Sequence, residues 1–408
     1  VQSARLDSLG LQVEATYRSL GNALEIAGSV ADLRGSDRAV TVAFALPVAA
    51  KPWRWWESIS AARVPSQEMA QVPFLEVAHT RYPLSALSLP GTAGLSLAIR
   101  MDEPATYRLA YNPKQRLYYV AFDFGPVPGE TVEGRALSAA SFRVVLYRHD
   151  PAWGFRSALR RYYDLFPDFF LKRARQDGGW GVWRSAELPD PAYLEAGFAY
   201  SWGPSESVYG WNSEHGILNL LYIEPEYYQM SLGDMASASN ERALERLRKL
   251  AAGDDAEWAL FENLHYTRAH SVHSWPSARE RTGLSLREFF QRLSLAAERS
   301  AFHDANGQVN ASVASRPGWI GDSTLGAMFA CNLDPDIPEG KGWFNTHLSL
   351  RPMLEDLQAR TGGRVDGLAL DCFLFLGPNF RRDHFRYANH PLTFVRTPNG
   401  LQPALLGI

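Results

Sequence analysis

The spacing of apolar residues changes near Pro151, and this change constrains the fold more than any other feature. From residue 11 to about 149, apolar and polar residues alternate with a period of two, in runs separated by Gly, Asn and Asp turns. Up to Phe166 the apolar residues then recur every three or four positions. A period of two is typical of half-buried strands, and a period of 3.6 is typical of helices. The sequence therefore predicts a multidomain protein, with an antiparallel β-sandwich over 1–150 and a connecting helix within 151–177.

The third region, 178–408, alternates short apolar runs with amphipathic stretches. Strand–helix–strand alternation implies right-handed βαβ units and a parallel sheet. A complete (β/α)8 barrel needs about 250 residues, and a long insertion at about 254–322 leaves too few for one. We expect an α/β domain that is the N-terminal part of a TIM-type barrel, or a smaller open sheet, with the insertion acting as a lid. The expected strands lie near residues 197, 218, 324 and 365.

Composition narrows the class of protein. The chain has 408 residues, of which 46% are hydrophobic and 21% charged, so two or three globular domains are expected. The net charge of −3 without a basic stripe argues against a nucleic-acid partner. No apolar run approaches the roughly 18 residues that a membrane span needs. Cys331 and Cys372 are expected to be free buried thiols, and both ends of the sequence suggest cuts through a longer protein.

Asp371 is the strongest candidate for chemistry. It closes the short apolar run 365–370, which is typical of a buried parallel strand. Burying an ionised carboxylate costs several kcal/mol unless it is compensated. Asp371 is therefore expected at the carboxyl end of its strand, where α/β folds place their active sites. The alternative is a structural aspartate that caps the following loop.

Other polar and aromatic side chains follow the remaining predicted strands. Converging carboxylates with aromatics suit the cleavage of a glycosidic bond, in which one carboxylate attacks or activates water and another protonates the leaving oxygen. Three residues are expected to hold sugar hydroxyls, namely Glu224, Asn332 and Asp334. Four aromatic residues are expected to form subsite walls, namely Tyr200, Trp202, Tyr227 and Trp319.

Each of these assignments has a structural alternative. Glu224 precedes Pro225 and can simply bond a loop, and Asn332 to Asp336 can form a turn with Asx caps or a structural Ca²⁺ loop. Arg381 and Arg382 can orient a negatively charged glycan or lie on a solvated helix face. The aromatic cluster Trp53 to Trp56 can pack an interface with the next domain or contact a glycan.

The histidines of the insertion do not predict a metal site. The spacing of His265, His270 and His273 matches no closed zinc pattern, and no cysteine lies nearby. The sequence also lacks a nucleophile elbow, a phosphate-binding glycine loop and a dinucleotide fingerprint. We therefore expect no cofactor.

Several stretches together resemble a known architecture. They are Ala39 to Pro47 leading to Trp53-Arg54-Trp55-Trp56, Tyr222 to Pro225, Asp366 to Asp371, Arg381 to Phe385 and Pro391 to Phe394. The chain resembles large microbial glycoside-hydrolase-like proteins that join a galactose-mutarotase-like sandwich to a (β/α)8 barrel. In the related retaining α-galactosidases and endo-α-N-acetylgalactosaminidases, an Asp at the end of the fourth barrel strand is the nucleophile. The resemblance implies that role for Asp371, and an acid/base on a later strand beyond this chain.

The leading hypothesis is a retaining glycoside hydrolase that acts on an oligo- or polysaccharide. One rival is a non-catalytic glycan-binding protein on the same scaffold, and another is a polysaccharide lyase or a metal-dependent hydrolase. The carbohydrate substrate slightly favours a secreted or periplasmic location. A half-barrel would leave the edge of its fourth strand open, so self-association through that edge is also expected.

Overall fold

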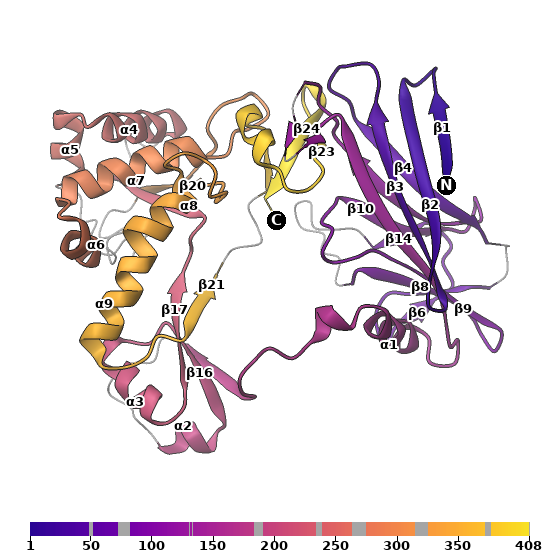
Figure 1. Cartoon of the computed structure of the whole chain (residues 1–408), viewed down its shortest axis with the longest axis horizontal. Helices are drawn as coiled ribbons and strands as arrows, with labels where there is room; N and C mark the ends of the chain where they lie inside the picture. The colour runs from indigo at the N-terminus through magenta and orange to yellow at the C-terminus, as the bar shows by residue number, and fades with distance from the viewer. Residues whose placement is uncertain are drawn as a thin grey trace. The chain divides into compact units, whose positions relative to one another are not determined.

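A computed structural model describes residues 1–48, 52–71, 82–129, 131–132, 134–182, 191–233, 239–262, 275–314, 325–371 and 377–407. The chain divides into two compact units, one of residues 1–173 with 377–406 and one of residues 174–376 with 407–408. The first unit is built of antiparallel sheets and the second is mixed α/β (Figure 1). Within the described ranges, no helix has the length and apolar character that a membrane span requires.

The first unit is a sandwich of two antiparallel sheets, as predicted. The first sheet runs β1 (Gln2–Leu6), β2 (Leu11–Leu20), β3 (Ala23–Asp32), β14 (Ala139–His149), β9 (Ala93–Ala98), β8 (Leu84–Leu89), β5 (Arg54–Trp56) and β6 (Ala62–Arg63). The second runs β4 (Val40–Pro47), β11 (Leu117–Phe124), β10 (Tyr107–Asn112) and β7 (Met69–Gln71). A short hairpin, β12 (Thr131–Val132) with β13 (Arg135–Ala136), lies outside these sheets.

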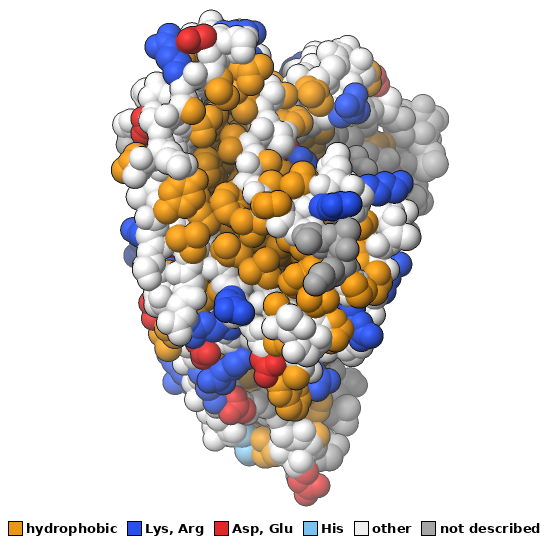
Figure 2. Space-filling view, turned by 90° about the vertical axis from the view of Figure 1, so that its right-hand side faces the viewer, with side chains coloured by type: hydrophobic (Ala, Val, Ile, Leu, Met, Phe, Trp, Pro, Cys, Tyr) orange, Lys and Arg blue, Asp and Glu red, His pale blue; other side chains and the backbone are white. Residues whose placement is uncertain are grey.

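The sandwich core forms because alternate residues of both sheets point inward. Ile26 and Val144 of the first sheet pack with Leu109 and Val120 of the second. Where β2 and β4 border the core, apolar residues stay only partly buried, namely Val13, Ala15, Val42, Phe44 and Leu46. Figure 2 looks at this side of the molecule, where apolar side chains gather in a hollow.

The aromatic cluster of residues 53–56 belongs to the sandwich. Trp55 is buried in its core. Trp56 donates from Nε1 to Ser88 Oγ at 2.9 Å. The Trp56 ring also packs in the apolar cluster beneath α1 (Phe155–Leu165). Both rings therefore serve packing inside the first unit, which corrects the expectation of an interdomain or glycan-facing cluster.

Helix α1 packs on the sandwich through the apolar face predicted from its spacing. Phe155, Ala158 and Tyr162 are buried against Leu84 and Val145 of the first sheet. The Tyr162 hydroxyl also donates to the Ile99 carbonyl at 2.9 Å. This helix and the turn η1 (Pro167–Phe170) therefore belong to the first unit, rather than forming a separate connector.

Residues 377–406 also belong to the first unit, which corrects the predicted third region of 178–408. They form a small sheet of β22 (Gly377–Asn379), β24 (Gly400–Gly407) and β23 (Thr393–Thr397), with the turn η7 (Arg382–Tyr387). Phe385 and Leu405 are buried with Val127, and Gly125 N–H donates to the Leu392 carbonyl at 2.8 Å. The physical reason is burial of these apolar side chains against the sandwich, which no local pattern reveals.

The second unit contains a four-stranded parallel sheet. Its order is β15 (Gly179–Val182), β16 (Phe198–Trp202), β17 (Leu218–Ile223) and β21 (Gly367–Leu370), and all three pairings are parallel. Three of the four predicted strands belong to this sheet, namely β16, β17 and β21. The run near 324 forms β20 (Leu325–Ala330) in another sheet, and β15, which was not predicted, is the remaining strand of the parallel sheet. β21 is therefore still the fourth strand, although a barrel is not seen among the described residues.

The predicted lid is instead part of a second core in the same unit. An antiparallel sheet of β18 (Tyr227–Gly233), β20 and β19 (Ala311–Ala314) packs against α4 (Asn240–Ala252) and α7 (Leu286–Ser300). α5 (Asp255–Glu262) and α6 (Trp275–Thr282) add Phe261 and Ala278 to this core. The described parts of the predicted insertion thus bury apolar side chains in this core, and Leu293 of α7 also lines a cavity beside Glu224.

Local helix signals were reliable here. The Ser239 side chain caps α4 at Arg242 N–H, and Gly253 ends that helix in the left-handed conformation. Ser285 and Glu288 form a capping box at the start of α7. The remaining elements are α2 (Pro191–Glu195), η2 (Glu206–Val208), α3 (Tyr209–Glu214), α8 (Lys341–Phe344), the π-helical turn η6 (Asn345–Leu350) and α9 (Arg351–Thr361).

Candidate functional site

Two carboxylates follow neighbouring parallel strands. Ile223 of β17 is paired with Leu370 of β21, and the next residues are Glu224 and Asp371. Asp371 N–H donates to the Ile223 carbonyl at 3.0 Å, which continues the ladder for one more residue. Parallel strands end at the same edge of their sheet, so both carboxylates lie at one edge. Asp371 is thus at the position that the sequence predicted.

The Tyr222 hydroxyl lies between these carboxylates. It is 2.7 Å from Glu224 Oε1 and 2.8 Å from Asp371 Oδ2. The sum of these two distances is the upper limit for the separation of Glu224 Oε1 and Asp371 Oδ2, which are therefore at most 5.5 Å apart. A phenol has a single proton to donate. The hydroxyl therefore donates its one proton to a single carboxylate at a time.

The electrostatics of Tyr222 agree with this hydrogen count. Burial, followed by the hydrogen bonds to Glu224 and Asp371, raises the pKa of the Tyr222 phenol well above its usual value. Two anionic neighbours disfavour a phenolate, so the hydroxyl keeps its proton. Tyr222 is therefore a neutral bridge between the two carboxyl groups.

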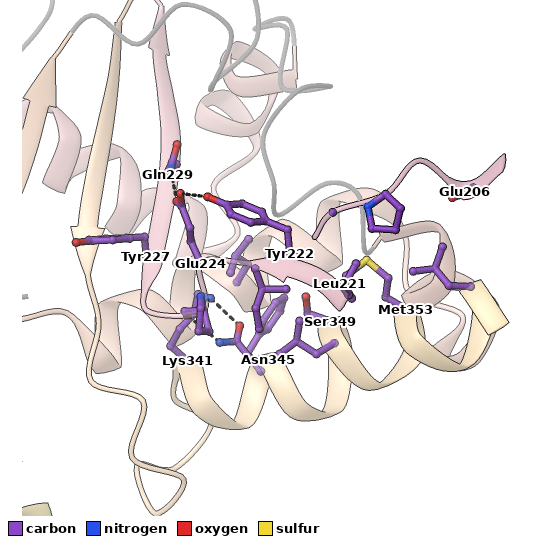
Figure 3. Close-up of a pocket in the computed structure, with 18 of the residues that line it drawn as sticks. Glu206, Leu221, Tyr222, Glu224, Tyr227, Gln229, Lys341, Asn345, Ser349 and Met353 are labelled. Atoms are coloured by element: carbon purple, nitrogen blue, oxygen red, sulfur yellow. Dashed lines mark hydrogen bonds between the residues drawn. The ribbon is translucent and has the colours of Figure 1, made fainter. Parts of the chain in front are cut away.

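Gln229 completes the surroundings of Glu224. Its Nε2 donates to Glu224 Oε2 at 3.0 Å, so each oxygen of this carboxylate has a partner on a neutral side chain. Gln229 is buried, and its Oε1 has no hydrogen-bond partner in the part of the chain that the structure describes. Figure 3 shows Tyr222, Glu224 and Gln229 converging at this point.

A row of aromatic rings leads to the carboxylates. The ring centroids of Trp202 and Tyr222 are 5.7 Å apart, and those of Trp180 and Trp202 are 4.6 Å apart. Strand register places Trp202, Tyr222 and Asp371 on one face of the sheet, since side chains alternate along each strand. Trp180 is 54% exposed, which leaves its ring open to a ligand. Sequence reasoning missed Trp180 because two glycines beside it weakened the strand pattern.

A buried lysine holds the turn after Glu224. Lys341 Nζ donates to the Pro225 carbonyl at 2.9 Å and to Asn345 Oδ1 at 2.6 Å. Asn345 Nδ2 donates to the same carbonyl at 2.8 Å. Burial lowers the pKa of the Lys341 ammonium to about 8, against smaller opposing effects of Cys331 and Glu226. This clamp restrains the backbone from which Glu224 projects.

Glu226 is the acid that sequence reasoning overlooked. Its exposed fraction is 0%, and neither carboxyl oxygen has a hydrogen-bond partner among the described residues. Burial raises the pKa of Glu226 to about 7, and the charges of Glu224 and Asp371 add to the effect. The sequence contains Glu224-Pro225-Glu226, but no local pattern indicates that the Glu226 side chain is buried.

A cavity of about 410 Å³ borders Glu224. Leu221 and Ile223 line it from the sheet, on the face opposite to Tyr222 and Asp371, and Met353 lines it from α9 (Figure 3). Lys341 and Asn345 lie at its buried end. At its exposed end Arg360 forms an ion pair with Glu206.

The other predicted aromatic residues lie near this edge in different roles. Trp202 stands in the aromatic row, and its Nε1 is buried without a hydrogen-bond partner in the described ranges. Tyr227 lines the cavity at the start of β18. Tyr200 instead donates its hydroxyl to the Gln176 carbonyl at 2.6 Å, so its polar end is used in packing.

Asn332 and Asp334 are turn residues, and the strand before them is not part of the parallel sheet, which corrects the predicted strand assignment. They follow β20, a strand of the antiparallel sheet. Asp334 N–H donates to Asn332 Oδ1, and Asp336 N–H donates to Asp334 Oδ1, each at 2.9 Å. These Asx turns match the alternative raised for the segment. Across the described ranges, no group of three Asp, Glu, His or Cys side chains suits a metal ion.

Arg381 and Arg382 belong to the first unit, and each is paired with an aspartate of the same unit. Arg381 Nε donates to Asp383 Oδ1 at 3.0 Å. Arg382 Nη1 donates to Asp37 Oδ2 at 2.5 Å, and its guanidinium lies over the Phe385 ring. Structural contacts thus account for both residues. Trp319, the three histidines and Cys372 lie outside the described residues, and Cys331 is a buried thiol whose Sγ donates to the Phe329 carbonyl at 3.7 Å.

Comparisons with known proteins add weak likenesses. No family model matches the sequence, and no curated protein matches it. An α-N-acetylgalactosaminidase of Bifidobacterium bifidum has a TM-score of 0.44 at 10% identity over 91% of this chain and 63% of its own. An α-galactosidase of Lactobacillus brevis has a TM-score of 0.34 at 10% identity over 54% of this chain and 37% of its own. This chain therefore spans less than two thirds of either protein.

A galactose mutarotase related enzyme of Lactobacillus acidophilus has a TM-score of 0.15 at 9% identity, over 35% of this chain and 62% of its own. These structural neighbours are two glycosidases and one mutarotase-related enzyme. At these TM-scores and identities the likenesses carry no argument about activity, which rests on the geometry of the site.

Proposed function

We propose that this chain carries the nucleophile and the acid of a retaining glycoside hydrolase. The observation that supports this most directly is the Tyr222 hydroxyl, bonded to both Glu224 and Asp371 at the carboxyl edge of a parallel sheet. The two carboxylate oxygens are at most 5.5 Å apart. Retaining enzymes hold their two carboxyl groups about 5–5.5 Å apart, whereas inverting enzymes need about 6.5–9.5 Å to admit a water.

The roles follow from the surroundings of each group. Asp371 attacks the anomeric carbon and forms a covalent glycosyl ester as the glycosidic C–O bond breaks. Glu224 gives the leaving oxygen a proton as the general acid. Glu224 then takes a proton from water, whose oxygen attacks the anomeric carbon and releases Asp371. The rings of Trp180 and Trp202 offer faces for the sugar.

This proposal differs from the role that the resemblance implied for the acid. The family pattern places the acid on a later strand, whereas here Glu224 follows the adjacent strand β17 and borders the same edge as Asp371. Gln229 and the Lys341 clamp hold Glu224 through neutral contacts and backbone restraint. In this proposal the general acid therefore follows β17, and not a later strand.

One observation favours a second function, glycan binding without turnover. The Tyr222 hydroxyl occupies the gap between the carboxylates, so a sugar can reach Asp371 only if this hydroxyl moves aside or becomes a partner. In a binding protein the bridge would stay closed, and the aromatic row would hold the sugar by stacking alone.

Asp371→Asn and Glu224→Gln test the proposal on a panel of aryl and alkyl glycosides. Asp371→Asn should lower kcat at least about 1,000-fold for every active substrate, because the covalent step is lost. Glu224→Gln should lower turnover strongly for alkyl leaving groups and only weakly for nitrophenyl ones, which need little protonation. Melting temperatures should stay within a few degrees.

Unchanged turnover in Asp371→Asn would contradict the proposed nucleophile. Binding of glycans by the wild-type chain without turnover of any panel member would favour the binding protein. Exposed Asp255, which lies outside the site, offers the matched control Asp255→Asn, and this variant should keep full activity.

A further inference from the structure

The residues that line the cavity beside Glu224 indicate which kind of ligand fits it. Most of its wall is apolar, from Leu221 of β17, Phe344 of α8, Leu350 of η6 and Met353 of α9. A volume of about 410 Å³ lies within the range of roughly 300–1,000 Å³ that small-molecule sites occupy. The π-helical turn η6 contributes Asn345 and Ser349 to the lining, and such turns are frequent at functional sites.

The charged groups of the cavity already have partners. Arg360 pairs with Glu206 and with Asp356 at the exposed end. At the buried end Lys341 and Asn345 bond each other and the Pro225 carbonyl. The Arg360 charge is thus neutralised by two carboxylates, whereas the Lys341 ammonium at the buried end is hydrogen-bonded to neutral oxygens that already occupy it.

The polar end of the cavity is at Glu224. Gln229 also lines it, is buried, and has an Oε1 without a hydrogen-bond partner in the described part of the chain. That oxygen has no surface open to the cavity, so the polar group that the cavity offers a ligand is Glu224. A fitting ligand thus has an oxygen-bearing part at Glu224, and an apolar part along Leu221 and Met353.

The two faces of the sheet separate these parts. Asp371, Tyr222 and Trp202 lie on one face, whereas Leu221 and Ile223 lie on the other. Tyr222 also borders the cavity at the strand end. Glu224 lies past the strand end and borders both the Tyr222 bridge and the cavity. In a retaining reaction the leaving group departs on the side opposite to the nucleophile. The cavity borders Glu224, the proposed proton donor to that group.

We propose that the cavity binds the apolar aglycone of the substrate, an aryl ring or a medium-length alkyl chain, with the glycosidic oxygen held at Glu224. This inference rests on the proposed function and specifies its substrate class. Cleavage leaves the sugar on the side of Asp371 and releases an aryl or alkyl alcohol into the cavity. The alcohol alone should therefore bind, without any sugar.

The first experiment uses octan-1-ol and phenol as probes of the full chain, with binding followed by ligand-observed NMR. Both should bind the wild-type chain saturably. Met353→Trp and Leu350→Trp fill the cavity from two elements and should weaken binding at least about tenfold. Leu260, which is 56% exposed on α5, provides the matched control Leu260→Trp, and this variant should bind as the wild type does. Absent binding, or equal binding by both cavity variants, would overturn the proposal.

The second experiment compares methyl glycosides with the corresponding octyl glycosides. The octyl member should have a kcat/KM at least about tenfold higher, and Met353→Trp should reduce this ratio to about one. Turnover of methyl and octyl members at equal rates would leave the hydrolase intact and refute the aglycone site. Binding of octan-1-ol without turnover of any glycoside would refute the hydrolase and retain an apolar site.

Discussion

Two buried glutamates of the second unit have opposite surroundings. Glu257 of α5 is 3% exposed, and its oxygens accept from Arg242 Nη2 at 2.8 Å and Arg246 Nε at 2.5 Å. Glu226 is 0% exposed, and neither oxygen has a hydrogen-bond partner among the described residues. An ionised buried carboxylate needs a counter-charge or several hydrogen bonds, whereas a protonated one loses only the hydrogen bonds that it leaves unmade. Glu257 thus belongs to an ion-pair network with two arginines. Glu226 is instead a buried acid that keeps its proton up to about pH 7.

This difference separates stabilising charge from chemistry. Glu25 and Asp123 of the sandwich follow the Glu257 pattern, since each is paired with an arginine. Glu224 is bonded instead by a tyrosine and a glutamine, and lies beside Glu226 and Asp371. A cluster of acids held by neutral partners is typical of catalytic sites, whereas an acid paired with arginine is typical of a stabilising network.

The largest effect is expected from Glu257→Gln. The amide leaves the guanidinium of Arg246 buried without an anion, which costs about 3–5 kcal/mol of unfolding free energy. Urea denaturation at pH 7 measures it, with Glu226→Gln as the matched variant. Glu226→Gln replaces a group already half protonated at this pH and should not destabilise the unit. Equal losses in the two variants would contradict the comparison.

The next effect is a pH dependence specific to Glu226. Its folded pKa of about 7 exceeds the ordinary value of 4.5, so the folded state binds more protons between these values. The unfolding free energy of the wild type should therefore fall, relative to Glu226→Gln, as the pH rises from about 4.5 to 7. At about 1.4 kcal/mol per pKa unit the fall amounts to roughly 3 kcal/mol. A difference between wild type and variant that stays constant over this window would show that Glu226 ionises normally.

Comparison of the wild type with Lys341→Met should show the opposite pH dependence of the unfolding free energy. The folded pKa of the Lys341 ammonium is about 8, below the ordinary 10.5, so the unfolded state binds more protons between these values. Wild-type stability should then rise relative to the variant by about 2 kcal/mol from pH 8 to 10. Exposed Lys249 on α4 provides the control Lys249→Met, which should show no such slope. A flat difference for Lys341→Met would mean that its ammonium titrates as in water.

The smallest effect on stability concerns the edge of the parallel sheet. β21 is an end strand of its sheet among the described residues, and its Leu370 is 48% exposed. The end strand β1 of the sandwich carries charged Arg5 instead. Leu370→Lys should change stability by less than about 0.5 kcal/mol and reduce self-association in sedimentation. Leu260→Lys on α5 is the control, and association that is unchanged by Leu370→Lys would place the contact elsewhere.

The sandwich strands and helix caps could be predicted because their signals are local. Alternating residues such as Val40, Val42 and Phe44 set a buried face within one strand. Ser239 and Gly253 satisfy backbone groups a few residues away. The placement of β20 could not be predicted, because an apolar run of six residues fits a parallel or an antiparallel sheet equally well.

The candidate site divides in the same way. The sequence by itself determined that Glu224 and Asp371 each follow an apolar strand. The predicted burial of the strand before Asp371 is wrong, because β21 is an end strand of its sheet among the described residues and its Leu370 is 48% exposed. Only the tertiary structure decided that β17 and β21 are neighbours, and so brought Tyr222 to Asp371 across 149 positions of sequence. It also decided that Glu226 turns inward while Asn332 and Asp334 cap a turn. Strand pairing and burial are sums over distant contacts, and no short stretch of sequence contains them.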